Sequence, residues 1–218
     1  MKNLLSLAWR IRNDSRFSRK KNLTVIDDLE SFKTFLKVSD ISFLQNLILS
    51  KDKTEYVLDY IGRYLGRDFW DKVTIVEQRE LVKVLEIENP SMCAIIRIND
   101  DLDQFSPDFL DSVIRSKVCI VLDSIQNPWN LGGIFRTNSA FEIFNVILLG
   151  NCVFPFNPRV IRASKGYVFE QKIKVMNLDQ FVSFINKIDH DIYFLETEGE
   201  NMTNFLHGNS STKIFVFG

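Results

Sequence analysis

Short apolar runs alternate with helix-like spacings over the first hundred residues of the chain. Four runs rich in branched and aromatic side chains predict strands, at Leu23–Ile26, Phe43–Leu49, Val73–Val76 and Cys93–Ile98. Between them, apolar side chains recur every three or four residues and predict helices, through Leu29–Leu36, Tyr56–Leu65 and Leu81–Leu85. This alternation indicates one α/β domain.

The second half of the chain contains strands of a different kind. Val118–Leu122 is apolar at every position, as a central parallel strand requires when helices cover both faces of its sheet. Similar runs follow, with helical stretches such as Phe181–Ile188 between them, at Val146–Leu149, Ile173–Met176, Ile192–Leu195 and Ile214–Phe217. Open parallel sheets bind ligands beyond the carboxyl ends of their strands, which here are the turns after Asp123, Gly150, Leu195 and Phe217.

An acidic, turn-rich stretch separates the two patterns. Asn99-Asp100-Asp101-Leu102-Asp103 leads to Ser106-Pro107-Asp108, which can cap a short helix running to about Arg115. We therefore predict a first domain at 1–98, a linker at 99–115 and a second domain at 116–218.

Composition is that of a soluble protein: 218 residues, 45% hydrophobic and 25% charged. No apolar stretch reaches the roughly 18 residues of a membrane span, and arginines follow the N-terminal apolar run too early for a secretory signal. We expect a cytoplasmic protein with no membrane partner. Cys93, Cys119 and Cys152 lie far apart, which predicts free thiols and supports neither a disulfide framework nor a metal site.

The net charge is −1, but basic residues gather at the N-terminus. Residues 1–21 contain one acid, Asp14, and seven cations: Lys2, Arg10, Arg12, Arg16, Arg19, Lys20 and Lys21. Such a segment can lie along a phosphate backbone, where each contact releases counterions. A solvated amphipathic helix is the alternative interpretation.

The turn after Asp123 is the strongest candidate for chemistry. Pro128 fixes the turn, Asn130 can cap the following helix, and Gly132-Gly133 allow a phosphate or another backbone segment to come close. There is no GxGxxG fingerprint and no P-loop lysine. Arg136 offers a planar fork of donors that suits a phosphate, although an ordinary surface ion pair explains it equally well.

The whole string from Leu122 to Phe141, LDSIQNPWNLGGIFRTNSAF, resembles the first signature motif of the SpoU-type (TrmH-like) RNA ribose 2′-O-methyltransferases, which belong to the SPOUT class. Downstream, the stretch 159–166 (RVIRASKG) is similar to the family's Arg/Ser/Gly stretch, and 195–199 (LETEG) to a loop that helps enclose the cofactor. The basic start, the α/β layout and 89–94 (NPSMCA) resemble the ribosomal-protein-like (L30e-like) RNA-binding domain that many members carry in front.

The resemblance implies transfer of a methyl group from S-adenosyl-L-methionine to a ribose 2′-hydroxyl of tRNA or rRNA. It implies that Arg136 acts at the reacting hydroxyl and an adjacent phosphate, by positioning them or as general base, with Asn130 holding that geometry. Arg162 and Ser164 would line the RNA side, together with the basic N-terminal residues. The implied cofactor-binding residues are Leu195, Thr197, Glu198, Gly199 and Gly218.

Three departures from the family pattern stand out. Asn127-Pro128 replaces the Asp-Pro that many members have, and Glu142 stands where a glycine often follows the Ala-Phe pair in the family. The sequence stops at Gly218, which matches the first residue of the family's Gly-x-Glu-x-x-Gly loop. We therefore expect an α/β knot domain that is truncated at its C-terminus and has an incomplete cofactor site. An inactive protein is one expected outcome of this truncation. If the knot is complete, the resemblance implies a homodimer. Two alternatives stay open, a non-catalytic RNA-binding protein derived from such an enzyme and an unrelated nucleotide-using α/β enzyme.

Overall fold

The computed structural model describes residues 2–64, 67–98, 102, 107–200 and 211–218. Contacts divide the chain into two compact units, which are described separately. Unit 1 comprises Met1–Asn99, Pro128–Arg136 and Phe154–Glu170. Unit 2 comprises Asp100–Asn127, Thr137–Val153 and Gln171–Gly218. The helix α7 (Pro128–Ala140) begins in unit 1 and ends in unit 2.

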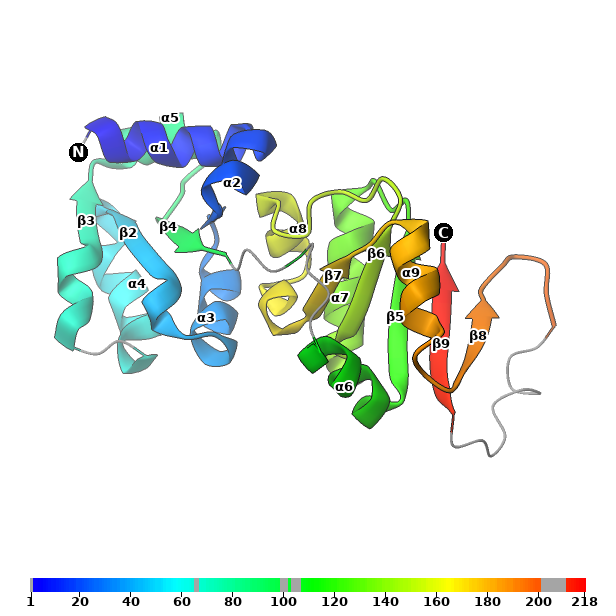
Figure 1. Ribbon diagram of the computed structural model, residues 1–218. Helices are drawn as coiled ribbons and strands as arrows, with labels where there is room; N and C mark the ends of the chain where they lie inside the picture. Colours follow the sequence, from blue (N-terminus) through cyan, green and yellow to red (C-terminus); the bar gives the residue numbers. More distant parts are fainter. Residues whose placement is uncertain (1, 65–66, 99–101, 103–106, 201–210) are drawn as a thin grey trace. The chain divides into compact units, whose positions relative to one another are not determined.

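Unit 1 has an α/β arrangement at its N-terminal part (Figure 1). Its α-helices there are α1 (Lys2–Asn13), α2 (Ser15–Lys21), α3 (Leu29–Val38), α4 (Thr54–Ile61) and α5 (Gln78–Leu85). Its strands are β1 (Leu23–Ile26), β2 (Leu44–Ser50), β3 (Val73–Val76) and β4 (Met92–Arg97). Short 3-10 turns occur at Ile41–Phe43, Lys51–Lys53, Gly62–Tyr64 and Arg67–Lys72. The later part adds α8 (Pro158–Ala163) and a 3-10 turn at Tyr167–Glu170.

The described strands of unit 1 form a sheet in the order β1-β4-β2-β3. The strand β4 is antiparallel to both β1 and β2, whereas β2 and β3 are parallel. The helices α1 and α5 cover one face, where Ala8 and Ile11 pack with Val25, Ile48 and Leu81 (Figure 1). Phe32 and Phe35 of α3 are also buried. The strand β1 contacts α1, α3 and α8, and this packing holds it in place.

The basic N-terminal segment is two helices separated at Asp14. The Asp14 carboxylate accepts a hydrogen bond from the Phe17 backbone N–H at 2.9 Å, which caps α2. At the other end Asn22 adopts a left-handed conformation, with φ 52°, and ends the helix. The acid that interrupts the basic run therefore has a structural function, because it starts a new helix.

Unit 2 is a parallel sheet with helices on its faces. Its strands are β5 (Val118–Asp123), β6 (Asn145–Leu149), β7 (Lys172–Val175), β8 (His190–Phe194) and β9 (Thr212–Phe217). Its helices are α6 (Pro107–Ser116), α9 (Leu178–Ile185) and the C-terminal part of α7. The described strands pair in the order β7-β6-β5-β9-β8, and every pairing is parallel.

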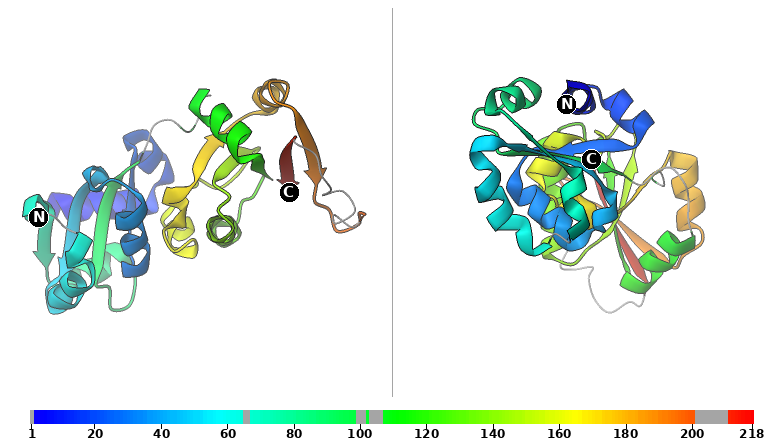
Figure 2. Two further views of the ribbon diagram at one scale, coloured as in Figure 1. Left: turned by 90° about the horizontal axis from the view of Figure 1, so that it is seen from below. Right: turned by 90° about the vertical axis from the view of Figure 1, so that its left-hand side faces the viewer.

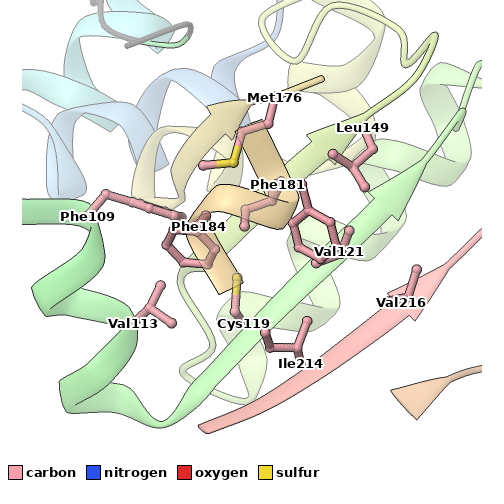
Figure 3. Close-up of a cluster of buried hydrophobic side chains, with 11 residues drawn as sticks. Phe109, Val113, Cys119, Val121, Leu149, Met176, Phe181, Phe184, Ile214 and Val216 are labelled. Carbon is pink, nitrogen blue, oxygen red and sulfur yellow. The ribbon is translucent and has the colours of Figure 1, made fainter. Parts of the chain in front are cut away.

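The core of unit 2 lies between its sheet and the helices α6 and α9. Phe109 and Val113 of α6 and Phe181 and Phe184 of α9 meet Cys119 and other strand residues there (Figure 3). In the left view of Figure 2, the part of α7 that belongs to unit 2 (Thr137–Ala140) lies on the opposite side of the sheet from α6 and α9. With helices on both faces, β5 has to be apolar on both sides, which explains its continuous apolar run.

The structure confirms the predicted α/β class and the parallel sheet, and it places every predicted strand within about two residues of its expected position. The helix expected up to about Arg115 is α6. Most of the remaining predicted linker, at 99–101 and 103–106, lies outside the described residues. The boundaries 1–98, 99–115 and 116–218 stay a prediction. In the described part of the chain, no helix is long and apolar enough to cross a membrane.

Candidate active site

The carboxyl ends of four neighbouring strands meet at one edge of the unit 2 sheet. Asp123 at the end of β5 pairs with Leu149 of β6, and Leu122 pairs with Phe217 of β9. Beyond β8, the Leu195 backbone N–H donates to the Val216 carbonyl at 2.9 Å. The parallel topology therefore brings together the turns that the sequence predicted as ligand sites.

A cavity of about 520 Å³ opens at this edge. Its lining comes from the ends of β5, β6 and β7 and the start of α9: Asp123, Leu149, Gly150, Val175, Met176, Asn177, Leu178 and Gln180. Gly150 has φ +60°, and a Cβ on it would meet Asp123 Oδ1 and the Ser124 side chain. Position 150 therefore requires glycine, because its backbone is left-handed and because a Cβ would collide with these side chains.

The segment Val175–Gln180 was not identified from the sequence as a site. The signal was available, because the same rule for parallel sheets applies to the end of β7 as to the other strands. Asn177 caps α9 by accepting from the Gln180 backbone N–H at 2.8 Å, and the Gln180 side chain accepts from the Asn177 N–H at 2.9 Å. This reciprocal pair fixes one wall of the cavity.

The predicted cofactor residues lie at the β8 and β9 side of the same edge. Leu195 is half-buried and Gly218 is exposed, at neighbouring strand ends. Thr197, Glu198 and Gly199 are exposed in the segment after β8. The 520 Å³ cavity is lined by other residues, so the structure places these five beside it along the sheet edge.

The helix α7 begins at Pro128, and this corrects one expectation. Asn130 lies inside the first turn and is not the residue before the helix. Proline is favoured at the first helical position because its φ is already helical and its missing N–H has no partner to lose there. The prediction that Asn130 caps the helix is therefore wrong.

Gly132 allows α7 to pack directly against α8. A Cβ at this position would collide with the Ala163 side chain, lie 2.7 Å from the Val160 carbonyl oxygen and lie 2.9 Å from the Ser164 nitrogen. Gly133, by contrast, has nothing within 4 Å of such a Cβ. The sequence predicted that these glycines allow either a phosphate or another backbone segment to come close. Gly132 allows the close approach of a backbone segment, that of α8.

The predicted catalytic residues Asn130 and Arg136 are both exposed on α7 and both belong to unit 1. Six residues of α-helix separate them by about 9 Å along the axis. Leu131 and Phe135, which lie between them in the sequence, are fully buried and hold the helix in place. The exposed positions of α7 are therefore presented from a rigid element.

Two of the predicted RNA-binding arginines meet at one buried carboxylate. Arg12 Nε donates to Asp27 Oδ2 at 3.3 Å, and Arg162 Nη2 lies 2.7 Å from Asp27 Oδ1. The Asp27 side chain is 4% exposed, whereas those of Arg12 and Arg162 are 19% and 33% exposed. Asp27 was not predicted as a site residue, because nothing near it in the chain indicates two arginine partners.

The other predicted RNA-binding residues differ in exposure. Arg10, Arg16, Arg19, Lys20 and Lys21 are exposed on α1 and α2, and the Arg10 guanidinium lies 3.9 Å from the Phe17 ring centroid. Ser164 is fully buried, donates to the Ile161 carbonyl at 3.0 Å and accepts from the Val168 N–H at 3.3 Å. In this structure Ser164 supports the end of α8 and does not face solvent, so the expected RNA contact is not made from its present position.

Cys93 and Cys119 are buried free thiols, and Cys152 is half-buried. Burial raises the pKa of all three thiols above the ordinary value. Cys152 also accepts a hydrogen bond from the Ile125 N–H at 3.3 Å, next to the candidate site. Among the described residues, no group of three or more His, Cys, Asp or Glu side chains could hold a metal ion.

Comparison with known families identifies the second half of the chain. Residues 117–218 match the family model described as the SpoU rRNA Methylase family. These residues form a SpoU methylase family domain. The match covers β5, α7 and the strands up to β9, including the sheet edge and the candidate catalytic residues.

Relatives of this SpoU domain are named methyltransferases. An uncharacterised tRNA/rRNA methyltransferase of Mycoplasma pneumoniae is 38% identical over 163 residues, which are 71% of this chain and 63% of the relative. A 23S rRNA (adenosine(1067)-2′-O)-methyltransferase of Streptomyces azureus is 27% identical over 111 residues, 50% of this chain and 41% of the relative. The chain thus spans less than two thirds of either relative.

The fold extends the likeness beyond the SpoU domain. The structure of an AdoMet-bound rRNA methyltransferase from Sinorhizobium meliloti superposes with a TM-score of 0.73 at 18% identity, over 99% of this chain and 77% of that one. At this identity the likeness shows the shared fold, which includes the N-terminal α/β part in front of the SpoU domain.

Proposed function

We propose that the protein is an RNA methyltransferase that transfers a methyl group from S-adenosylmethionine to a ribose 2′-hydroxyl of tRNA or rRNA. The match of residues 117–218 to the SpoU family carries this proposal. The Streptomyces azureus relative is named for 2′-O-methylation of 23S rRNA, which supports the choice of hydroxyl. The AdoMet-bound Sinorhizobium meliloti structure supports the choice of methyl donor.

The carboxyl edge of the unit 2 sheet fits S-adenosylmethionine. Its cavity of about 520 Å³ is within the range of small-molecule sites. The exposed Asp123 carboxylate can accept hydrogen bonds from a ribose diol, and Leu149, Met176 and Leu178 offer apolar surface to a base. Leu195, Thr197, Glu198, Gly199 and Gly218 would hold it from the β8 and β9 side. When bound, S-adenosylmethionine supplies a methyl group already activated by the positive sulfonium.

Arg136 would position the nucleophile. Its guanidinium has five N–H donors in a fixed plane and can hold a phosphate oxygen and the neighbouring ribose hydroxyl together. Literal proton abstraction would need a neutral guanidinium, whereas arginine side chains in proteins keep their proton. Asn130 on the same helix has an amide that both donates and accepts, and would orient the hydroxyl. Alignment of this kind is the main requirement when the methyl group is already activated.

Basic residues of α1 and α2 would bind the RNA backbone. Arg10, Arg16, Arg19, Lys20 and Lys21 are exposed on these two short helices. Their contacts with phosphates would be independent of base sequence, so affinity should fall as salt concentration rises.

The Arg136→Ala variant tests the proposal. The protein is incubated with S-adenosylmethionine carrying a labelled methyl group and with unmodified tRNA or rRNA transcripts. Label is measured in the RNA and assigned to 2′-O positions by resistance of the adjacent linkage to alkali. We expect transfer by the unchanged protein and a loss of about 10²-fold or more in the variant, because misplacing the nucleophile costs that much.

Arg115→Ala is the matched control, since Arg115 is an exposed arginine of α6 outside the candidate site. It should keep full activity, and both variants should unfold at the denaturant concentration of the unchanged protein. Active Arg136→Ala protein would contradict the role of Arg136. Absence of transfer by the unchanged protein, with RNA binding retained, would contradict the enzymatic proposal.

A further inference from the structure

A second cavity, of about 350 Å³, lies within unit 1. It is formed by the end of α1, the start of α2, the residue after β1, the start of α7, and α8 with the residue before it. Its lining residues are Arg12, Asn13, Ser15, Asp27, Trp129, Asn157, Pro158, Arg159 and Arg162. The cavity is separate from the 520 Å³ cavity at the sheet edge, with which it shares no lining residue.

The charge of this cavity is positive. Arg12, Arg159 and Arg162 line it together with a single carboxylate, Asp27. The Nε of Arg12 and the Nε of Arg162 face Asp27 at 3.3 Å and 3.2 Å, so both guanidinium planes are fixed. Both groups remain partly exposed, and a guanidinium has five donors, so each can still donate to a phosphate from its exposed edge.

An exposed indole stands beside these arginines. Trp129 is 56% exposed although it belongs to the first turn of the well-packed helix α7. Arg136 follows seven residues later, close to two full turns of α7, so it projects from the same side of the helix as Trp129. A rigid aromatic ring next to arginines is the arrangement with which proteins bind unpaired nucleotides, by stacking on the base and pairing with the phosphate.

We propose that this cavity is a subsite for one unpaired nucleotide of the RNA substrate, whose base stacks on Trp129 and whose phosphate is bound by Arg12, Arg159 and Arg162. Asp27 is a positioning residue that holds two of these guanidinium groups. The size fits, because about 350 Å³ is at the lower end of small-molecule sites. The subsite rests on the proposed function in that it takes RNA as the substrate, but it requires no methyl donor.

Fluorescence of Trp129 gives the direct test. The chain has three tryptophans, so a Trp9→Phe, Trp70→Phe variant leaves Trp129 as the reporter. A ten-nucleotide single-stranded RNA of mixed sequence is the probe. Stacking should quench the emission saturably, whereas the same RNA annealed to its complement should quench much less. Emission unchanged at RNA concentrations that saturate binding would overturn the subsite.

Binding by variants separates stacking from charge. Trp129→Ala should weaken binding of the single-stranded RNA by roughly 5- to 150-fold, the usual cost of replacing a stacking aromatic residue by alanine. Trp129→Phe should restore most of it, since phenylalanine also stacks. Trp70→Ala is the matched control, because Trp70 is 57% exposed in unit 1 but does not line the cavity. Equal affinities for Trp129→Ala, Trp70→Ala and the unchanged protein would refute the proposal.

The two proposals fail in different ways. In methyl-transfer assays, Trp129→Ala should raise KM for RNA and leave kcat nearly unchanged, whereas Arg136→Ala should lower kcat. Transfer with no effect of Trp129→Ala on KM would overturn the subsite and leave the enzyme proposal standing. Quenching and weakened binding without any transfer by the unchanged protein would support the subsite and overturn the enzyme proposal.

Discussion

Gly132 and Gly133 are neighbours on α7 with opposite surroundings. A side chain at Gly132 would enter α8, whose backbone lies within 3 Å, while a side chain at Gly133 would extend into open space. The sequence motif presents the two glycines as equivalent. In the structure, only the first is required by packing, because it sets how closely the helix that carries Asn130 and Arg136 approaches α8.

We predict that Gly132→Ala lowers the free energy of unfolding by about 1–3 kcal/mol, the usual cost of forcing an extra carbon into a packed contact. Gly133→Ala should leave stability unchanged or raise it by up to about 1 kcal/mol, because alanine favours a helix over glycine. Denaturant unfolding of the two single variants checks this. Equal effects of the two substitutions would contradict the packing role of Gly132.

At the scale of elements, Asp27 connects α1, β1 and α8. It follows the last residue of β1 and pairs with Arg12 of α1 and Arg162 of α8, which lies 135 residues away in the sequence. Two further hydrogen bonds join β1 and α3 to the segment that contains α8: Thr24 Oγ1 donates to the Phe156 carbonyl at 2.7 Å, and Ser31 Oγ to the Ile161 carbonyl at 3.3 Å. Gly166, with φ +82°, lies against the Ser31 carbonyl. The segment 154–170 is therefore held against β1 and α3.

Asp27→Asn should lower the free energy of unfolding by about 1–3 kcal/mol. Removing one partner of a fully buried ion pair costs about 3–5 kcal/mol, and partial exposure of both arginines reduces that value. Lys51→Gln is the control, because it removes an exposed pair with Glu77 and should change stability by less than about 0.5 kcal/mol. Chemical denaturation measures both changes. A loss for Asp27→Asn no larger than the control would show that Asp27 does not hold the segment.

At the scale of the whole molecule, each unit buries one thiol in a central strand. Cys93 belongs to β4 of unit 1 and Cys119 to β5 of unit 2. Burial raises the pKa of both thiols, so each stays protonated in the folded state at pH values where it would ionise in the unfolded chain.

These thiols should make stability fall at alkaline pH. Below about pH 8 both states are protonated and the thiols add no pH dependence; above about pH 8.5 only the unfolded state loses protons. The free energy of unfolding should then fall by up to about 1.4 kcal/mol per pH unit for each thiol. Unfolding by denaturant between pH 7 and pH 10 tests this. Cys93→Ala and Cys119→Ala should each show a shallower fall, and slopes identical to that of the unchanged protein would contradict the prediction.

Local pattern was sufficient for the elements of this protein. The strands from Leu23–Ile26 to Ile214–Phe217 and several of the helices between them followed from apolar periodicity, because burial on one or both faces constrains neighbouring residues directly. The parallel order of strands in turn predicted the edge at which Asp123, Gly150 and Leu195 meet. Helix bounds were less accurate, since α5 begins at Gln78 and α9 at Leu178, ahead of the predicted starts at Leu81 and Phe181, and α8 was not predicted. The start of α7 was expected at Asn130, because the preference of proline for the first helical position was given too little weight.

The sequence by itself determined the α/β class, the parallel sheet and the SpoU motif, because each depends on residues close together in the chain. The tertiary structure alone decided which glycine of Gly132-Gly133 is packed, that Ser164 is buried, and that Arg12 and Arg162 share Asp27. It also placed Trp129 beside those arginines. Such arrangements depend on contacts between different elements, such as Gly132 of α7 with Ala163 of α8 and Asp27 with Arg162, and no local periodicity records them.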